Sequence, residues 1–450
     1  MPKLILTSIQ FIGLSLGLIL FAISAQAKTV ETQLDNGLKI IVHEDHRAPV
    51  VVSQLWYRIG STYEHSGKSG LSHVLEHMMF KGTESLKPGE FSEIIAANGG
   101  SENAFTSRDF TAYVQRIASD RLELCLKLEA DRMRNVVFQQ SEFTKEVAVV
   151  REERRWRVES NPKSKLFEQF YATAYLTSPM RIPTIGWMDD LKAMEMRDAE
   201  TWYRQWYAPN NATLVIVGDV ESSDAIELAS KYFSDLKPSK IEQPTTRPEI
   251  EQNGLRRIEM HGQTANPYVI MGYKMPILHD EKVSEEDIYA LSVLTGILDG
   301  GSSARIPMQM LRGDEIAVDA GVSYDPLERL AGLFMFAGTP NQGVSTLELE
   351  QAFKDQITQL QKTPVSMSEL DRVKAQVIAN KVFEKDSMFN RAMQIGMLDS
   401  VGHDWRLLDQ SVEKVNRVTP ADIQRVAKSY FDDRQLTIAT LFPQQEGEGS

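Results

Sequence analysis

The sequence is poor in cysteine and in positive charge. Its 450 residues include one cysteine, Cys125, which excludes an intramolecular disulfide and a metal site made of several thiolates. Because Cys125 lies among leucines, we expect a buried and unreactive thiol. The 49 basic residues are outnumbered by 62 acidic residues, and no tract is rich in lysine or arginine. We therefore expect no binding to nucleic acid or anionic lipid.

Long apolar runs are also absent, except at the N-terminus. There Lys3 precedes an apolar run from Phe11 to Ile23, which ends in Ala25-Gln26-Ala27, the small-x-small pattern of a signal-peptidase site. We expect a signal peptide at residues 1–27, cleaved after Ala27, and a mature protein that is periplasmic or secreted, without stable membrane insertion. The alternative is an uncleaved membrane anchor, but a span needs about 20 apolar residues and serine interrupts this run.

Hydrophobic periodicity predicts strands and helices in alternation. The composition, with 42% hydrophobic and 25% charged residues, is that of an ordinary globular protein, and the length predicts two to four domains. Strands are expected in 29–52, with a turn at Asn36-Gly37, and at Ala104–Arg116 and Thr213–Val217. Helices are expected at Gly70–Phe80, Asp120–Arg134, Ser141–Glu159 and Asp198–Tyr207. This alternation predicts an α+β fold class.

The chain also contains an internal repeat. The helix-then-strand segment Asp198–Val217 recurs as Asp422–Leu441, and Trp206-Tyr207 then matches Tyr430-Phe431. Between the copies, Pro238–Pro248 contains three prolines and reads as a linker. We expect two similar α/β halves, each with an antiparallel-rich sheet packed against helices. The expected boundaries are an N-terminal half at 28–237, a linker at 238–250, a C-terminal half at 251–443 and a disordered tail at 444–450.

The segment His73-Val74-Leu75-Glu76-His77 has the pattern of a metal site on a helix. Residues four apart lie on one helical face, about 5–6 Å apart at Cβ, so both imidazoles can reach one ion while Glu76 lies beside it. Two imidazoles and a carboxylate suit zinc, and Glu76 can then serve as general base toward a water. The alternative is two exposed histidines on a helix, but this spacing among only eight histidines favours the metal.

The third ligand is expected from the acidic segment that follows, where several carboxylates compete: Glu142, Glu146, Glu152, Glu153 and Glu159. Glu146 and Glu153 are seven apart and share a helical face, so one can bind the metal while the other holds a ligand histidine. Glu152 points elsewhere. The alternative is a solvated charged face that pairs with the neighbouring arginines.

These residues resemble the pitrilysin family of zinc metallopeptidases, family M16, with its inverted HxxEH motif. The segment from Gly60 through Thr83 is similar to the family signature, and the overall resemblance covers nearly the whole mature chain. Within the family, the chain most resembles bacterial members that are similar to the mitochondrial processing peptidase β subunit. The resemblance implies Glu153 as third zinc ligand and Glu146 as its support. It also implies that an extended peptide pairs with the edge strand at Asn103, Ala104, Phe105 and Thr106, and that two halves form a clamshell chamber.

The second half departs from the zinc pattern. Continuing the alignment of Pro49 with Pro267 places Leu291, Leu294 and Thr295 opposite the motif, so we expect one zinc per chain. In many relatives this half supplies an arginine and a tyrosine that bind substrate. Here Arg312 matches the arginine, whereas Val318 stands where tyrosine is expected, and Tyr324 is the nearest tyrosine. The resemblance therefore implies a homodimer, or a heterodimer with a family member that lacks the zinc motif.

Together these features predict a zinc-dependent endopeptidase that hydrolyses peptides or unfolded polypeptides. The alternative is a noncatalytic or partner-dependent assembly subunit that binds zinc and peptides. The complete HxxEH motif favours the enzyme, whereas Val318 favours a dependence on a partner.

Overall fold

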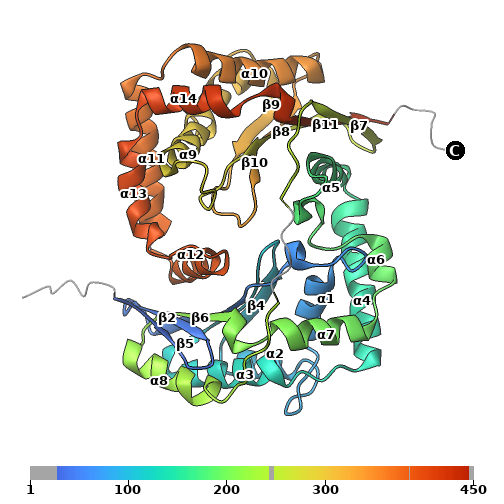
Figure 1. Ribbon diagram of the computed structural model, residues 1–450, viewed down its shortest axis with the longest axis vertical. Coiled ribbons are helices and arrows are strands. Elements are labelled where there is room, and N and C mark those ends of the chain that lie inside the picture. The colour runs from blue at the N-terminus through green and yellow to red at the C-terminus, as the bar shows by residue number, and fades with distance from the viewer. Residues whose placement is uncertain (1–27, 243–247, 385, 445–450) are drawn as a thin grey trace, which may run out of the picture.

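The computed structural model describes residues 28–242, 248–384 and 386–444, and shows two helix-backed sheets that face one another (Figure 1). The predicted signal peptide at 1–27, residues 243–247 of the predicted linker and nearly all of the predicted tail lie outside the described residues. Within the described ranges, no helix combines the length and the apolar character that crossing a membrane requires. The α+β class and the two-half arrangement are confirmed.

The first sheet has six strands in the order β1-β2-β6-β3-β5-β4. The turn at Asn36-Gly37 joins the first two strands, as predicted, and Gly37 has a φ of 91°. Only β2 and β6 pair in parallel; the other neighbours are antiparallel. The strands are β1 (Thr29–Gln33), β2 (Lys39–Glu44), β3 (Val50–Tyr57), β4 (Ser101–Thr106), β5 (Thr111–Ala118) and β6 (Ala212–Gly218).

The second sheet repeats this topology with five strands in the order β7-β11-β8-β10-β9. Its last strand in the chain, β11, pairs in parallel with β7 and antiparallel with β8, as β6 does with β2 and β3. The predicted repeat is therefore present in the strand order. The strands are β7 (Arg256–Gly262), β8 (Tyr268–Met275), β9 (Ala317–Ser323), β10 (Gly332–Pro340) and β11 (Leu436–Pro443).

The sheet registers correct the alignment offset that the sequence suggested. Trp56 pairs with Thr213, and Gly272 pairs with Thr437, so Trp56 corresponds to Gly272. This offset is two residues shorter than the one from Pro49 to Pro267, because β3 and β8 pair with β6 and β11 in registers that differ by two residues relative to the two prolines. Carried forward, it places Tyr289, Ser292 and Val293 opposite the metal motif instead, and the second half still lacks the motif.

One predicted strand and one predicted helix differ from their expected ranges. The strand predicted at Ala104–Arg116 is a hairpin of β4 and β5, because the polar residues at 107–109 lie in the turn and the Ser107 backbone N–H donates to the Phe110 carbonyl at 2.8 Å. The helix predicted at Ser141–Glu159 ends at Arg154 and continues as a π-helical turn. The helices are α1 (Leu71–Met78), α2 (Glu90–Ala97), α3 (Leu122–Arg134), α4 (Gln140–Arg154), α5 (Pro162–Ala174), α6 (Met188–Lys192), α7 (Met196–Trp206), α8 (Ser222–Phe233), α9 (Glu285–Asp299), α10 (Thr346–Lys362), α11 (Met367–Glu384), α12 (Met388–Ser400), α13 (Leu407–Arg417) and α14 (Pro420–Tyr430).

One helix from each half packs on the sheet of the other half. Helix α12 lies across β3 and β6 of the first sheet, where Ile395 and Leu398 pack with Trp56 in one buried cluster. Helix α5 packs on β11 of the second sheet, where Phe170 joins a buried cluster with Ile270. Figure 1 shows both crossings. Because apolar burial stabilises both contacts, the two halves pack against each other.

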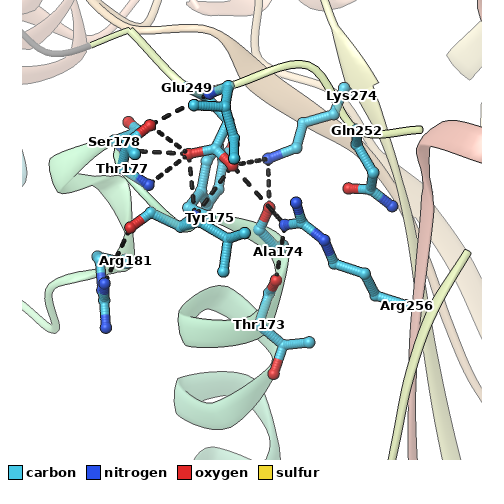
Figure 2. A network of polar contacts seen from close by, with 12 residues as sticks. Thr173, Ala174, Tyr175, Thr177, Ser178, Arg181, Glu249, Gln252, Arg256 and Lys274 are labelled. Atoms are coloured by element: carbon cyan, nitrogen blue, oxygen red, sulfur yellow. Dashed lines mark hydrogen bonds and ion pairs between the residues drawn. The ribbon is translucent and has the colours of Figure 1, made fainter. Parts of the chain in front are cut away.

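A polar network also joins the end of α5 to the segment that leads into the second sheet (Figure 2). The Glu249 carboxylate accepts hydrogen bonds from the backbone N–H groups of 176–178, at 2.9 to 3.0 Å. Arg256 donates to the last carbonyls of α5, at 2.8 and 2.9 Å, and Lys274 donates to the Ala174 carbonyl. These cations satisfy carbonyl groups that a helix end leaves unpaired.

Candidate metal centre

Helix α1 begins at a turn that is capped by a glutamate side chain, which the sequence did not predict. The Glu64 carboxylate accepts from the backbone N–H groups of Gly70 and Ser72, each at 2.7 Å, and so caps the helix. Gly70 has a φ of 84°, and a side chain there would meet the Ile185 carbonyl. The apolar face of α1 is buried in the first core, so the opposite face presents the two histidines.

The structure brings His73, His77 and Glu153 together, with one possible ligand atom from each within 4.8 Å of the others. The Glu153 Oε2 atom lies 3.6 Å from His73 Nε2 and 3.7 Å from His77 Nε2. Tetrahedral zinc with bonds of about 2.1 Å separates its ligand atoms by roughly 3.4 Å. The spacing therefore fits one zinc ion with little rearrangement.

The protonation of His73 also suits a metal. Burial, followed by the neighbouring His77 and Arg157, lowers the pKa of His73 to about 3. The imidazole is therefore neutral at neutral pH, which is the form that binds metals. No group among the described residues pairs with the buried Nδ1 atom of His73.

Glu146 supports His77 from the side away from the cluster. Its Oε2 atom lies 3.0 Å from His77 Nδ1, and its Oε1 atom accepts from Lys81 at 2.7 Å. A hydrogen bond from Nδ1–H to the carboxylate directs the Nε2 lone pair of His77 toward Glu153. Carboxylates that orient a ligand histidine in this way are typical of metal sites.

The competing carboxylates of α4 occupy different places. Glu153 faces the histidines, and its Oε1 atom accepts from Arg157 at 2.9 Å. The Glu152 side chain is 69% exposed and pairs with Arg155 at the surface. Glu142 pairs with Lys145. Within the described residues, Glu153 is the carboxylate that completes a group of three with the histidines.

Glu76 lies on α1 between the two histidines and is nearly buried. Thr106 of β4 donates to its Oε2 atom at 2.5 Å, a contact that the sequence did not reveal. Burial raises the pKa of Glu76 above its ordinary value. A carboxyl group with a raised pKa is better matched to taking up and releasing a proton near neutral pH.

The last four residues of β4, at the edge of the first sheet, are the predicted peptide-binding residues Asn103, Ala104, Phe105 and Thr106. Among the described strands, β4 pairs with β5 alone, so its other edge is open. Helix α1 contacts both β4 and α4 and lies between them in Figure 1. The open edge therefore runs beside the metal centre.

The structure does not bring the predicted residues of the second half to this centre. Arg312 is exposed and donates to the carbonyls of Ser302 and Pro307, close to it in the chain. Val318 is 64% exposed on the edge strand β9. The Tyr324 hydroxyl donates to the Pro276 carbonyl at 2.7 Å. The role of Arg312 therefore stays a prediction.

The chain belongs to the metallopeptidase family M16. The family model described as Insulinase (Peptidase family M16) matches residues 39–186, and the model described as Peptidase M16 inactive domain matches 194–377.

Particular relatives cover nearly the whole chain. The zinc protease PqqE of Helicobacter pylori is 31% identical and spans 95% of this chain and 96% of its own length. The probable mitochondrial-processing peptidase subunit beta of Arabidopsis thaliana is 23% identical over 93% of this chain and 79% of its own. The crystal structure of a protease from Helicobacter pylori has a TM-score of 0.87 at 30% identity, covering 93% of this chain and all of that one.

One further solved structure shares the fold. The periplasmic protease PqqL of Escherichia coli has a TM-score of 0.78 at 20% identity, and the match covers 92% of this chain but 47% of that chain. The separately solved first half of PqqL is matched over 92% of its length, with a TM-score of 0.77. The fold of this chain therefore occupies about half of PqqL.

Proposed function

We propose that the protein is a zinc-dependent endopeptidase that hydrolyses peptides or unfolded polypeptides. His73, His77 and Glu153 hold one zinc ion per chain, and Glu76 is the general base. The observation that carries this proposal is the convergence of three possible ligand atoms within 4.8 Å of one another, two from α1, which also bears Glu76, and one from α4. The names of the zinc protease relatives agree with it.

The residues around the centre have separate tasks in this proposal. When bound, zinc supplies a Lewis acid that polarises a carbonyl and makes a water more acidic. Glu76 would accept a proton from the attacking water and pass it to the leaving amine, while Thr106 holds the carboxylate in place. Glu146 orients His77. The open edge of β4 binds an extended peptide by main-chain hydrogen bonds, as exposed sheet edges do in other peptide-binding domains.

The place of action follows from the N-terminal sequence. We propose that residues 1–27 are a signal peptide cleaved after Ala27, which delivers the protein to the periplasm or the medium. The periplasmic location in the name of PqqL supports this assignment. The alternative is retention at the membrane by an uncleaved N-terminus, and the N-terminal residue of the purified protein decides between them.

The experiment is a zinc and turnover measurement on the purified protein and two variants. We expect about one zinc per chain and hydrolysis of a quenched peptide library by the wild type. Glu76→Gln should keep zinc and lose hydrolysis, because it retains the ligands and removes the base. His77→Ala should lose tight zinc binding. A folded Glu76→Gln protein without zinc would contradict the role assigned to Glu76.

A second candidate is a partner-dependent subunit that binds zinc and peptides. The observation that favours it is Val318, whose exposed apolar side chain stands where many relatives have a tyrosine that binds substrate. In this case a second copy, or a family member without the zinc motif, would supply the missing donor. The match to about half of PqqL agrees with such a pairing.

A further inference from the structure

A shallow apolar groove lies beside the metal centre on the solvent side of α4. It has a volume of about 610 Å³ and is lined by Ala148, Val149, Glu152, Glu153 and Trp156. Trp156 is 74% exposed and Val149 is 48% exposed. These two large apolar side chains have no part in the proposed chemistry, yet they share the groove with Glu153.

The backbone presents Trp156 in an unusual way. Residues Arg155–Glu159 form a π-helical turn, closed by a hydrogen bond of 2.8 Å from Ser160 N–H to the Arg155 carbonyl. The Ser160 hydroxyl donates to the Trp156 carbonyl at 2.7 Å. Such turns are rare and occur frequently at functional sites. Here the turn begins two residues after Glu153 and holds Trp156 at the surface.

We propose that Trp156 and Val149 form a subsite for an apolar side chain, aromatic or branched aliphatic, of the bound peptide. This inference rests on the proposed function, because it takes the centre at Glu153 as the place of cleavage. Residues three apart on a helix lie about 5–6 Å apart at Cβ, and an extended peptide advances about 3.3 Å per residue. The side chain in the groove therefore belongs to a residue within about two positions of the scissile bond.

The size of the groove favours a single side chain over a protein partner. Five residues line it, whereas a stable protein interface takes about 20–30 residues from each side. The face of an indole beside an isopropyl group offers apolar contact area, which suits an apolar side chain. The ion pairs of Glu152 with Arg155 and of Glu153 with Arg157 border the groove with charge.

The test measures peptide binding, so it does not depend on turnover. Zinc-loaded Glu76→Gln protein is titrated with short serine-rich peptides in which one phenylalanine replaces serine at each position in turn. We expect tighter binding for phenylalanine at one position. Adding Trp156→Ala should reduce that advantage about tenfold, whereas Trp156→Phe should keep most of it. The matched control is Leu347→Ala, which removes a similarly exposed apolar side chain from α10 and should change nothing.

The outcomes separate this proposal from the proposed function. The proposed subsite is refuted if phenylalanine improves peptide affinity at no position, or if Trp156→Ala leaves that improvement unchanged. Weaker self-association of Trp156→Ala with unchanged peptide preference also overturns it, because the groove is then a subunit contact. A wild type that hydrolyses none of the peptides, although the advantage depends on Trp156, refutes the proposed function and supports the subsite. Equal zinc content in all variants excludes an indirect effect through Glu153.

Discussion

At the scale of single residues, neighbouring carboxylates on α4 have different surroundings. Glu153 points to the histidines and is held by Arg157, while Glu152 points to solvent. A helix turns by about 100° per residue, so a shift of one position removes a side chain from the metal face. Glu146, two turns before Glu153, meets His77 on the same face. This arrangement gives each carboxylate a distinct expected effect.

We predict that Glu153→Gln lowers zinc affinity far more than Glu152→Gln, because the first change removes a ligand and the second alters a surface ion pair. Glu146→Gln should lie between them, with a loss of about 10–100-fold, which is typical for groups that orient a ligand. Metal titration against a chelator of known affinity measures the three values. The reverse ranking of Glu152 and Glu153 would show that the register of α4 is wrong.

At the scale of elements, α12 is the part of the second half that covers the first sheet. Gly396 faces Trp56 so closely that a Cβ atom there would clash with the indole ring. The loop after α12 is held by His403, which is 5% exposed and stacks on His279 with ring centroids 3.8 Å apart. His279 Nε2 lies 3.0 Å from the Val401 carbonyl. The packing of α12 therefore continues into a stacked pair of histidines, of which His403 is buried and His279 is exposed.

This pair predicts a loss of stability in acid. Burial, followed by the neighbouring His279, lowers the pKa of His403 to about 4, whereas an unfolded histidine titrates near 6.5. Between those values the unfolded chain binds the proton first, so the free energy of unfolding falls as the pH falls from about 6.5 to about 4. Below about pH 4 this contribution is constant.

His403→Phe keeps a stacking ring and removes the titration. We expect its free energy of unfolding to fall less than that of the wild type over this range, by roughly 1–3 kcal/mol. Urea unfolding at a series of pH values measures the free energy of unfolding of both proteins. In the difference between them, the contributions of the other titrating groups cancel. Parallel curves for the two proteins across this range would contradict a neutral, buried His403.

At the scale of the whole molecule, the two halves share a strand order but differ in the functional side chains that they carry. The first half carries the whole candidate metal centre, while the second half has Val318 exposed on an edge strand and the Tyr324 hydroxyl bonded to the Pro276 carbonyl. Valine cannot donate a hydrogen bond to a developing oxyanion, and such donors are worth several kcal/mol in other enzymes. This asymmetry is the reason why we propose a partner that completes the site.

We predict that the isolated chain keeps its zinc and its affinity for extended peptides but turns over slowly. Val318→Tyr is expected to restore part of the rate, and Val318→Phe, which adds the ring without the hydroxyl, is the matched control. The measurement is kcat/KM of the purified chain with no second polypeptide present. A value of about 10⁴ M⁻¹s⁻¹ or more for the wild type alone would refute the dependence on a different partner chain.

Local sequence determined the features of this protein that depend on short-range geometry. His73, Glu76 and His77 share a face because helix periodicity places them there, and the Asn36-Gly37 turn joins β1 and β2 as predicted. The repeat was readable because both copies keep the same order of apolar and aromatic residues. Periodicity also narrowed the third ligand to the face of Glu146 and Glu153, though it left the choice between them open.

Tertiary structure decided what depends on contacts between distant segments. The approach of Glu153 to the histidines requires α4 to pack against α1, and the contact of Thr106 with Glu76 requires β4 to end beside that helix. The exchange of α5 and α12 between the halves and the groove at Trp156 arise in the same way. No residue spacing encodes these contacts, because the packing of buried apolar faces sets them once the whole chain has folded.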